Sequence, residues 1–249
     1  TSSGAFVFRN DALGGSGNVA IITTAGVLDI NGLAPRAGTS SLAPLVLASG
    51  TSLTTPAAGA FEYDGVAFYA TSVASSRQVV ATEQISTVVS DRTGSDVDTF
   101  QAFFANTQDV LTLAASTTYE FEAQFWIVRS AGTTSHTTSV QFGGTAASGG
   151  ATIDYFAEVN NQAGNVLTNV QRVAGSSFGA VAITAANTDA TENILIKMRG
   201  IIRSNSAGSV QPGFTYSAAP GGAPTIKRNS FFRAWPIGSS SVAAVGNWG

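Results

Sequence analysis

Alternation of apolar and polar residues dominates the second half of the chain. The clearest stretch is TTYEFEAQFWIVRS, in which one face is apolar throughout: Tyr119, Phe121, Ala123, Phe125 and Ile127. The other face begins polar and ends apolar: Glu120, Glu122 and Gln124 are followed by Trp126 and Val128. A period of two predicts a β-strand with one face in a core. The apolar end of the second face predicts that the strand then runs beneath another layer.

The segment ENILIKMRGIIRS repeats this pattern. Its inward positions are apolar and its outward positions are basic: Ile194, Ile196, Met198 and Ile202 against Lys197, Arg199 and Arg203. Five more segments complete the set: SVQFGGTA, TIDYFAEV, AVAIT, SVQPGFTYSA and RNSFFRAWPIG. About eight to ten strands at this spacing, with turn signals between them, predict an all-β fold. The simplest arrangement is a β-sandwich of the jelly-roll kind.

The first third of the chain is less regular. GNVAIITTAGVLDINGL offers two short β segments separated at Gly26. Two interpretations stay open: an ordinary hairpin, and fibrous β-structure in which several chains complete one another's cores. Residues 34–60 read as a linker with one short strand at 45–47, and three prolines exclude a long helix there.

The ten residues FEYDGVAFYA predict a tight hairpin, because Asp64-Gly65 suits the two positive-φ positions of a type I′ turn. Pairing across that turn sets Tyr63 opposite Val66 and Phe61 opposite Phe68, so these four side chains share one face. A hairpin alone is marginal in water, so this apolar face needs a cover. The following segment, SSRQVVATEQISTVV, reads either as the one helix of the chain or, given its β-branched residues, as extended.

Composition narrows the classes of function. Only 11% of the 249 residues are charged, against about 25% in ordinary domains, while 44% are hydrophobic. A surface so poor in charge predicts extensive burial between subunits. The net charge of −3 argues against a nucleic-acid partner. No apolar run is long enough to insert into a membrane, and the absence of cysteine excludes disulfides and Cys-ligated metals.

Two patterns suggest hydrolase chemistry, and each has a plainer interpretation. GSSFG matches the nucleophile elbow with Ser177 in the serine position, but a strand-like segment follows it where the elbow needs a helix. The elbow also needs a later histidine, and the single histidine, His136, comes earlier. We interpret GSSFG as a loop and His136 as a hydrogen-bonded surface residue among serines and threonines.

The carboxylates suggest two further sites. Asp91, Asp96 and Asp98 lie close in sequence but lack the spacing of a calcium loop, so we interpret them as a solvated turn. Glu120 and Glu122 lie about 7 Å apart on one strand face, a spacing that glycosidases use, but the sequence supplies no cleft. We therefore assign no catalytic residue, no cofactor and no metal ligand.

Two stretches together resemble bacteriophage tail-fibre and other virion appendage proteins. LAPLVLASGTSLTTPAAGAFEYDGVAFYAT, with SSRQVVATEQI after it, is similar to a segment that precedes the distal domain in that group. FFRAWPIGSSSVAAVGNWG resembles the closing motif of the same proteins. The resemblance implies a homotrimeric virion protein, in which a fibrous N-terminal part leads into a jelly-roll knob of the tumour-necrosis-factor and complement type. It implies no active site, and hence no enzyme.

On this interpretation, sister chains around a three-fold axis cover the apolar hairpin face. The trimer-interface candidates are Phe61, Tyr63, Val66, Phe68, Trp126 and Val128. We expect an extended attachment segment over residues 1–60, the aromatic hairpin and its connection over 61–90, and the jelly-roll knob over 91–249.

The expected partners are other virion proteins of the tail or capsid. The expected role is that of a fibre component whose knob contacts a host polysaccharide or an outer-membrane receptor. Two rival functions stay open. One is a capsid decoration (cement) protein that stabilises the shell, and the other is a depolymerase or carbohydrate esterase.

Overall fold

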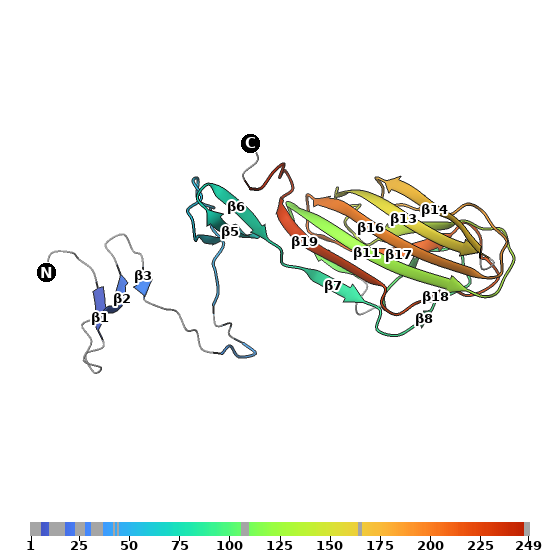
Figure 1. Ribbon diagram of the computed structural model, residues 1–249, viewed down its shortest axis with the longest axis horizontal. Helices are drawn as coiled ribbons and strands as arrows, with labels where there is room; N and C mark the ends of the chain where they lie inside the picture. The colour runs from blue at the N-terminus through green and yellow to red at the C-terminus, as the bar shows by residue number, and fades with distance from the viewer. Residues whose placement is uncertain are drawn as a thin grey trace. The chain divides into compact units, whose positions relative to one another are not determined.

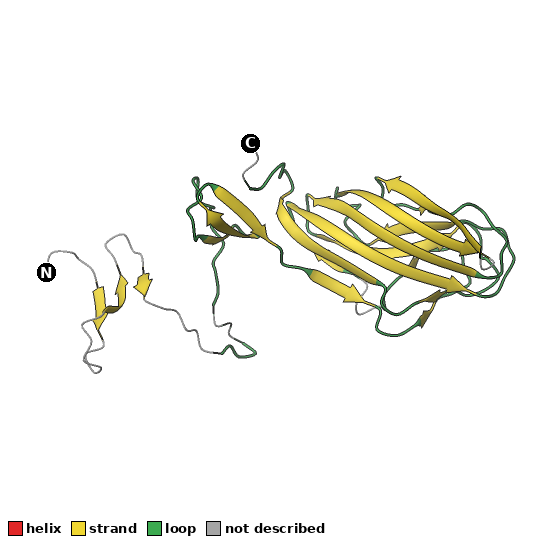
Figure 2. Cartoon of the chain, in the orientation of Figure 1, coloured by secondary structure: helices red, strands yellow, loops and turns green. Residues whose placement is uncertain are grey.

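The structure, a computed structural model, consists of strands and loops. It describes residues 6–9, 18–22, 28–30, 37–41, 43, 45–105, 110–163 and 166–246. No helix occurs in these residues (Figure 2), and so none that could cross a membrane. The all-β class predicted from the sequence is confirmed. The chain divides into two compact units, Thr1–Leu47 and Ala48–Gly249.

The first unit contains one small antiparallel sheet. Its strands are β1 (Phe6–Arg9), β2 (Asn18–Ile22) and β3 (Leu28–Ile30), with β2 in the middle. The two β segments expected from the sequence are therefore strands, and they pair with each other within one chain. The strand expected at residues 45–47 is wrong: Leu45 and Val46 are exposed and belong to no strand. The intertwining of several chains stays a prediction.

A second three-stranded sheet, in the order β4-β5-β6, begins the other unit (Figure 1). Its strands are β4 (Phe61–Tyr63), β5 (Phe68–Val73) and β6 (Ser76–Val80). The expected hairpin is present, but its predicted register is wrong, because Tyr63 pairs with Phe68 and Phe61 pairs with Ala70. This register keeps Phe61, Tyr63 and Phe68 on one face and leaves Val66 in the loop.

The side chain of Asp64 explains the longer loop. Its Oδ1 accepts hydrogen bonds from the backbone N–H groups of Val66 and Ala67, both at 2.8 Å. Gly65 has a φ of 92°, whereas Asp64 is not among the residues with positive φ, so the turn is not type I′. A local side-chain to backbone bond has replaced the two-residue turn that the dipeptide favours.

The helix interpretation of residues 75–89 is wrong, and the extended interpretation is confirmed. This segment forms β6 and then β7 (Gln84–Thr87). β6 pairs with β5, and β7 pairs with β19 of the sandwich. Pairing with existing strand edges outweighs the weak helical preference of a sequence rich in valine and threonine.

The rest of the chain forms two antiparallel sheets. The larger has the order β14-β13-β16-β11. Two strands, β19 and β18, pair one after the other with the remaining edge of β11. β7 then pairs with β19, and β8 pairs with β18. The strands of this larger sheet besides β7 are β8 (Arg92–Thr93), β11 (Thr117–Arg129), β13 (Thr152–Ala163), β14 (Val166–Gly175), β16 (Glu192–Ser204), β18 (Thr225–Ile226) and β19 (Phe231–Ser239).

The smaller sheet has the order β10-β17-β12-β15, with β9 also beside β17. Its strands are β9 (Gln101–Ala102), β10 (Leu111–Leu113), β12 (Thr138–Gly143), β15 (Val181–Ala182) and β17 (Gly208–Tyr216). The two sheets pack face to face around one core, so the fold is a β-sandwich. The ring centroids of Phe121 in β11 and Phe142 in β12 lie 6.1 Å apart across it. The inward faces predicted for β11 and β16 are confirmed as buried.

β7 belongs to the sandwich although it precedes the expected start of the knob. The next residue, Val88, is 7% exposed, and its N–H donates to the carbonyl of Ser230 at 2.8 Å.

We expect a fragment of residues 82–249 to have a higher free energy of unfolding than a fragment of residues 90–249. The difference should be about 2 kcal/mol, the contribution of one buried valine. Urea denaturation followed by circular dichroism measures the difference. Equal midpoints for the two fragments would show that β7 contributes nothing.

Candidate functional site

The β4–β5 hairpin carries a row of aromatic rings on one face. The rings of Tyr63 and Phe68 stack with centroids 4.5 Å apart, and those of Phe61 and Phe68 lie 5.9 Å apart. Phe61 is 54% exposed, and the other two rings are half-buried. Stacked rings of this kind contribute most when water is excluded from them, so this face gains from a cover.

The chain itself covers the opposite face of the same sheet. Tyr69 and Thr71 are buried there, and Leu53 crosses that face, where its N–H donates to Glu62 Oε1 at 2.6 Å and its carbonyl accepts from Arg77. The Arg77 guanidinium binds Glu62 at 3.0 Å and lies over the Tyr69 ring. Burial, with a hydrogen bond to Asp64, raises the pKa of the Tyr69 phenol to about 12. The sheet therefore has one face closed by its own chain and one open aromatic face.

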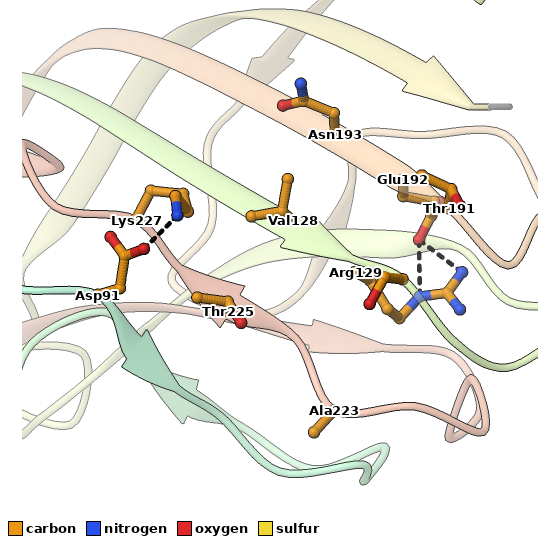
Figure 3. A pocket seen from close by; sticks show the side chains of 10 residues that line it. Asp91, Val128, Arg129, Thr191, Glu192, Asn193, Ala223, Thr225 and Lys227 are labelled. Atoms are coloured by element: carbon orange, nitrogen blue, oxygen red, sulfur yellow. Dashed lines mark hydrogen bonds and ion pairs between the residues drawn. The ribbon is translucent and has the colours of Figure 1, made fainter. Parts of the chain in front are cut away.

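Trp126 and Val128, the other two predicted interface residues, lie on the outward face of β11 in a different sheet. Trp126 is 38% exposed, and its indole N–H donates to Oδ1 of Asn193. Val128 lines a pocket of about 400 Å³. Figure 3 shows it between two ion pairs, Asp91 with Lys227 and Arg129 with Glu192. The surroundings of these two residues are thus more polar than the sequence indicated.

A buried charged cluster lies where β11 ends and β16 begins, and sequence reasoning missed it. Arg129 and Glu192 pair directly in register, and each is at most 3% exposed. The Arg129 guanidinium donates to Glu192 Oε2 at 2.9 and 3.1 Å and also to the carbonyls of Gly132 and Asp189. The expectation that His136 lies at the surface is wrong: it is 1% exposed, and its ring adds a third contact to Oε2 at 2.9 Å. The cluster ties the β11–β12 and β15–β16 loops to the sheet.

The structure separates Ser177 of the GSSFG match from His136, in agreement with the interpretation of GSSFG as a loop. Phe178, next to Ser177, accepts a hydrogen bond from Phe142 at the far end of β12, whereas His136 precedes the start of β12. Extended chain from His136 to Phe142 spans roughly 20 Å. Both His136 nitrogens already face oxygen acceptors, Nδ1 lying 2.7 Å from the carbonyl of Thr134. His136 is therefore not placed to activate Ser177.

The paired glutamates Glu120 and Glu122 are neutralised by arginines. Arg199 lies 3.2 Å from Glu120 and 3.1 Å from Glu122, and Arg233 also binds Glu122. The hydrogen bond from Arg233 lowers the pKa of Glu122 below its ordinary value. A general acid of a glycosidase needs the opposite shift, so this pair suits a surface ion network better than catalysis.

The three aspartates do not converge either. Asp91 pairs with Lys227, and Asp96 accepts a hydrogen bond from Gly221 N–H at 2.9 Å. Within the described ranges, no group of three or more metal-binding side chains forms a site.

Comparison with known proteins adds no relative: no family model matches the chain, and neither does any curated protein.

Proposed function

We propose that this chain is a homotrimeric structural protein of a bacteriophage virion, a tail or head fibre component whose distal knob contacts the host surface. The open aromatic face of β4–β5 carries the proposal. One face of that sheet holds the buried Tyr69 and Thr71 and binds Leu53 of the same chain, while on the other face Phe61 is 54% exposed beside its stacked neighbours. Equivalent faces of three chains, packed around one axis, would give these rings the cover that a single chain lacks.

The strand order of the sandwich supports a jelly roll as the knob. From β7 to β19 the chain alternates between the two sheets: β11, β16 and β19 lie in the larger, and β12, β15 and β17 in the smaller. The β13–β14 hairpin widens the larger sheet at its edge. This alternation is typical of double-sheet jelly rolls. The stretches that resemble virion appendage proteins also form two defined elements, the β4–β6 sheet with β7, and β19.

A structural role also agrees with the state of the candidate catalytic groups. Ser177 and His136 lie apart, Glu120 and Glu122 are held by arginines, and Asp91 and Asp96 bind separate partners. The trimer accounts for the low charge of the chain through buried subunit surface.

Two measurements test the proposal. Light scattering of the whole chain should give a mass near three times its 25.3 kDa, and a monomeric mass would overturn the trimer. Gold-labelled antibody against the chain should decorate the tail or a fibre in electron micrographs of the intact particle. Label spread over the capsid shell would replace the fibre role with that of a decoration (cement) protein. An unlabelled particle would remove the virion assignment.

A further inference from the structure

The larger sheet is interrupted beside Trp126. β11 pairs with β19 as far as Gln124 and Phe231, and pairing resumes with β18 at Ile127 and Ile226. Between β18 and β19 the residues 227–230 contain a turn, and residues 88–91, with a bend at Ser90, join β7 to β8 at the same level. These two connections leave a pocket of about 510 Å³ with Trp126 in its wall.

Hydrogen bonds fix the shape of this pocket. Ser230, 1% exposed, accepts a hydrogen bond from Trp126 N–H at 3.0 Å and donates to the carbonyl of Lys227 at 2.8 Å. Asp91 accepts from the N–H of Arg228 at 2.9 Å and from the Lys227 ammonium. The backbone bond from Arg228 and the Lys227 contact hold the pKa of Asp91 below its usual value, so it stays ionised. The turn is therefore ordered before any ligand binds.

The pocket presents one aromatic ring and an excess of positive charge. The Trp126 ring is partly exposed, and its N–H is already bound to Asn193. Lys227 and Arg228 contribute two cations against the single carboxylate of Asp91. Among the described residues, the Arg228 guanidinium has no hydrogen-bond or ion-pair partner, and it is exposed. Its planar donors match a carboxylate.

We propose that this pocket binds an acidic saccharide, with the sugar ring against Trp126 and its carboxylate on Arg228 and Lys227. A pyranose ring has an apolar face of C–H groups, which packs on an indole, and hydroxyl groups, which need polar partners such as Asp91. This inference rests on the proposed function, because it names the chemistry through which the knob contacts the host surface.

The charge of the pocket favours this ligand over a second copy of the chain. An apolar subunit surface placed over Trp126 would desolvate Lys227 and Arg228, two cations that share the single carboxylate of Asp91, which is costly. A saccharide carboxylate supplies a second negative charge. The sequence-based assignment of Trp126 to the trimer interface therefore competes with the saccharide site, and the two have different consequences for mutation.

The test titrates the whole chain with tetragalacturonate and with sialyllactose by calorimetry, using maltotetraose and sulfate as comparisons. At least one acidic sugar should bind ten-fold or more tightly than maltotetraose, and sulfate should not bind measurably. Arg228→Ala and Trp126→Ala should each weaken that binding at least ten-fold. Arg172→Ala, which removes an exposed arginine from β14, is the matched control and should change nothing.

Three results would overturn the saccharide site. The first is that neither acidic sugar binds. The second is that maltotetraose or sulfate binds as tightly as the acidic sugars, and the third is that the Arg228→Ala variant binds as tightly as the wild type. Light scattering on each protein shows whether it is still a trimer, so that a failure of the saccharide site is distinguished from a failure of the proposed trimer. Dissociation by Trp126→Ala would assign Trp126 to the interface instead. A monomeric wild-type chain that still binds the acidic sugar would overturn the trimer and leave the pocket supported.

Discussion

Glu192→Ala is expected to lower the free energy of unfolding by about 3–5 kcal/mol, the usual cost of breaking a buried ion pair. Glu192 is 1% exposed and is the only carboxylate among the contacts that the Arg129 guanidinium makes in the described structure. Without it, Arg129 stays buried, held by backbone carbonyls that carry no formal charge. Since whole domains are stable by only about 5–15 kcal/mol, this single change threatens the fold.

Two further variants separate the charge from the hydrogen bonds. Glu192→Gln keeps one acceptor oxygen for Arg129 or for Asn187, whose amide N–H donates to Oε1 at 2.6 Å, so its loss should be smaller. Glu158→Ala removes a carboxylate from an exposed pair, 3.9 Å from Arg172, and should cost less than about 1 kcal/mol.

Urea denaturation of the wild type and the three variants, all at the same protein concentration, measures these differences. If Glu192→Ala loses no more stability than Glu158→Ala, the cluster does not secure the loops at this end of the sandwich.

The signal for this cluster was present in the sequence. Arg129 has the same parity as the inward residues of β11, and Glu192 has the same parity as Ile194 and Ile196 in β16. A charge at an inward position must find a partner or lie beyond the core, and alternation alone does not distinguish these cases. The strand register, which sets Arg129 opposite Glu192, depends on how distant segments pair.

Long strands were predictable because burial repeats over many residues. β11 and β16 bury every second side chain over most of their length, so the period survives local exceptions. Strands of two residues, such as β8 and β18, carry no period, and they exist because a longer neighbour offers them an edge. The connections that join β8 to β7 and β18 to β19 form the pocket beside Trp126, which explains why the sequence did not indicate that pocket.

The hairpin shows a different limit. Its aromatic face was predictable from alternation, but its register depended on whether Asp64 would adopt positive φ or bond to the amides beyond it. Because the two registers differ by two residues, Phe61, Tyr63 and Phe68 keep a common face in both. The aromatic face was therefore predicted correctly although the turn type was wrong, and only Val66 lies outside that face.

Phe61→Ser combined with Phe68→Ser is expected to convert the proposed trimer into monomers. Fully burying an exposed phenylalanine contributes about 1.5–3 kcal/mol. Because Phe61 is 54% exposed and Phe68 is half-buried already, the two rings in each of three chains amount to on the order of 5 kcal/mol per assembly. The chain itself should tolerate the change, because Phe61 is 54% exposed and Tyr69 secures the other face of the sheet. Light scattering should show a mass near 25.3 kDa, with an unchanged circular dichroism spectrum.

Val170→Ser provides the control for a general loss of surface hydrophobicity, since Val170 is 57% exposed on β14, away from the hairpin sheet. It should leave the trimeric mass and the thermal midpoint unchanged. A double serine variant that stays trimeric with normal heat resistance would show that the hairpin is not an interface. The exposed rings would then need another cover, because three stacked aromatic side chains in water gain little from one another. Dissociation of the double variant alone would identify the open face of β4–β5 as the surface on which assembly depends.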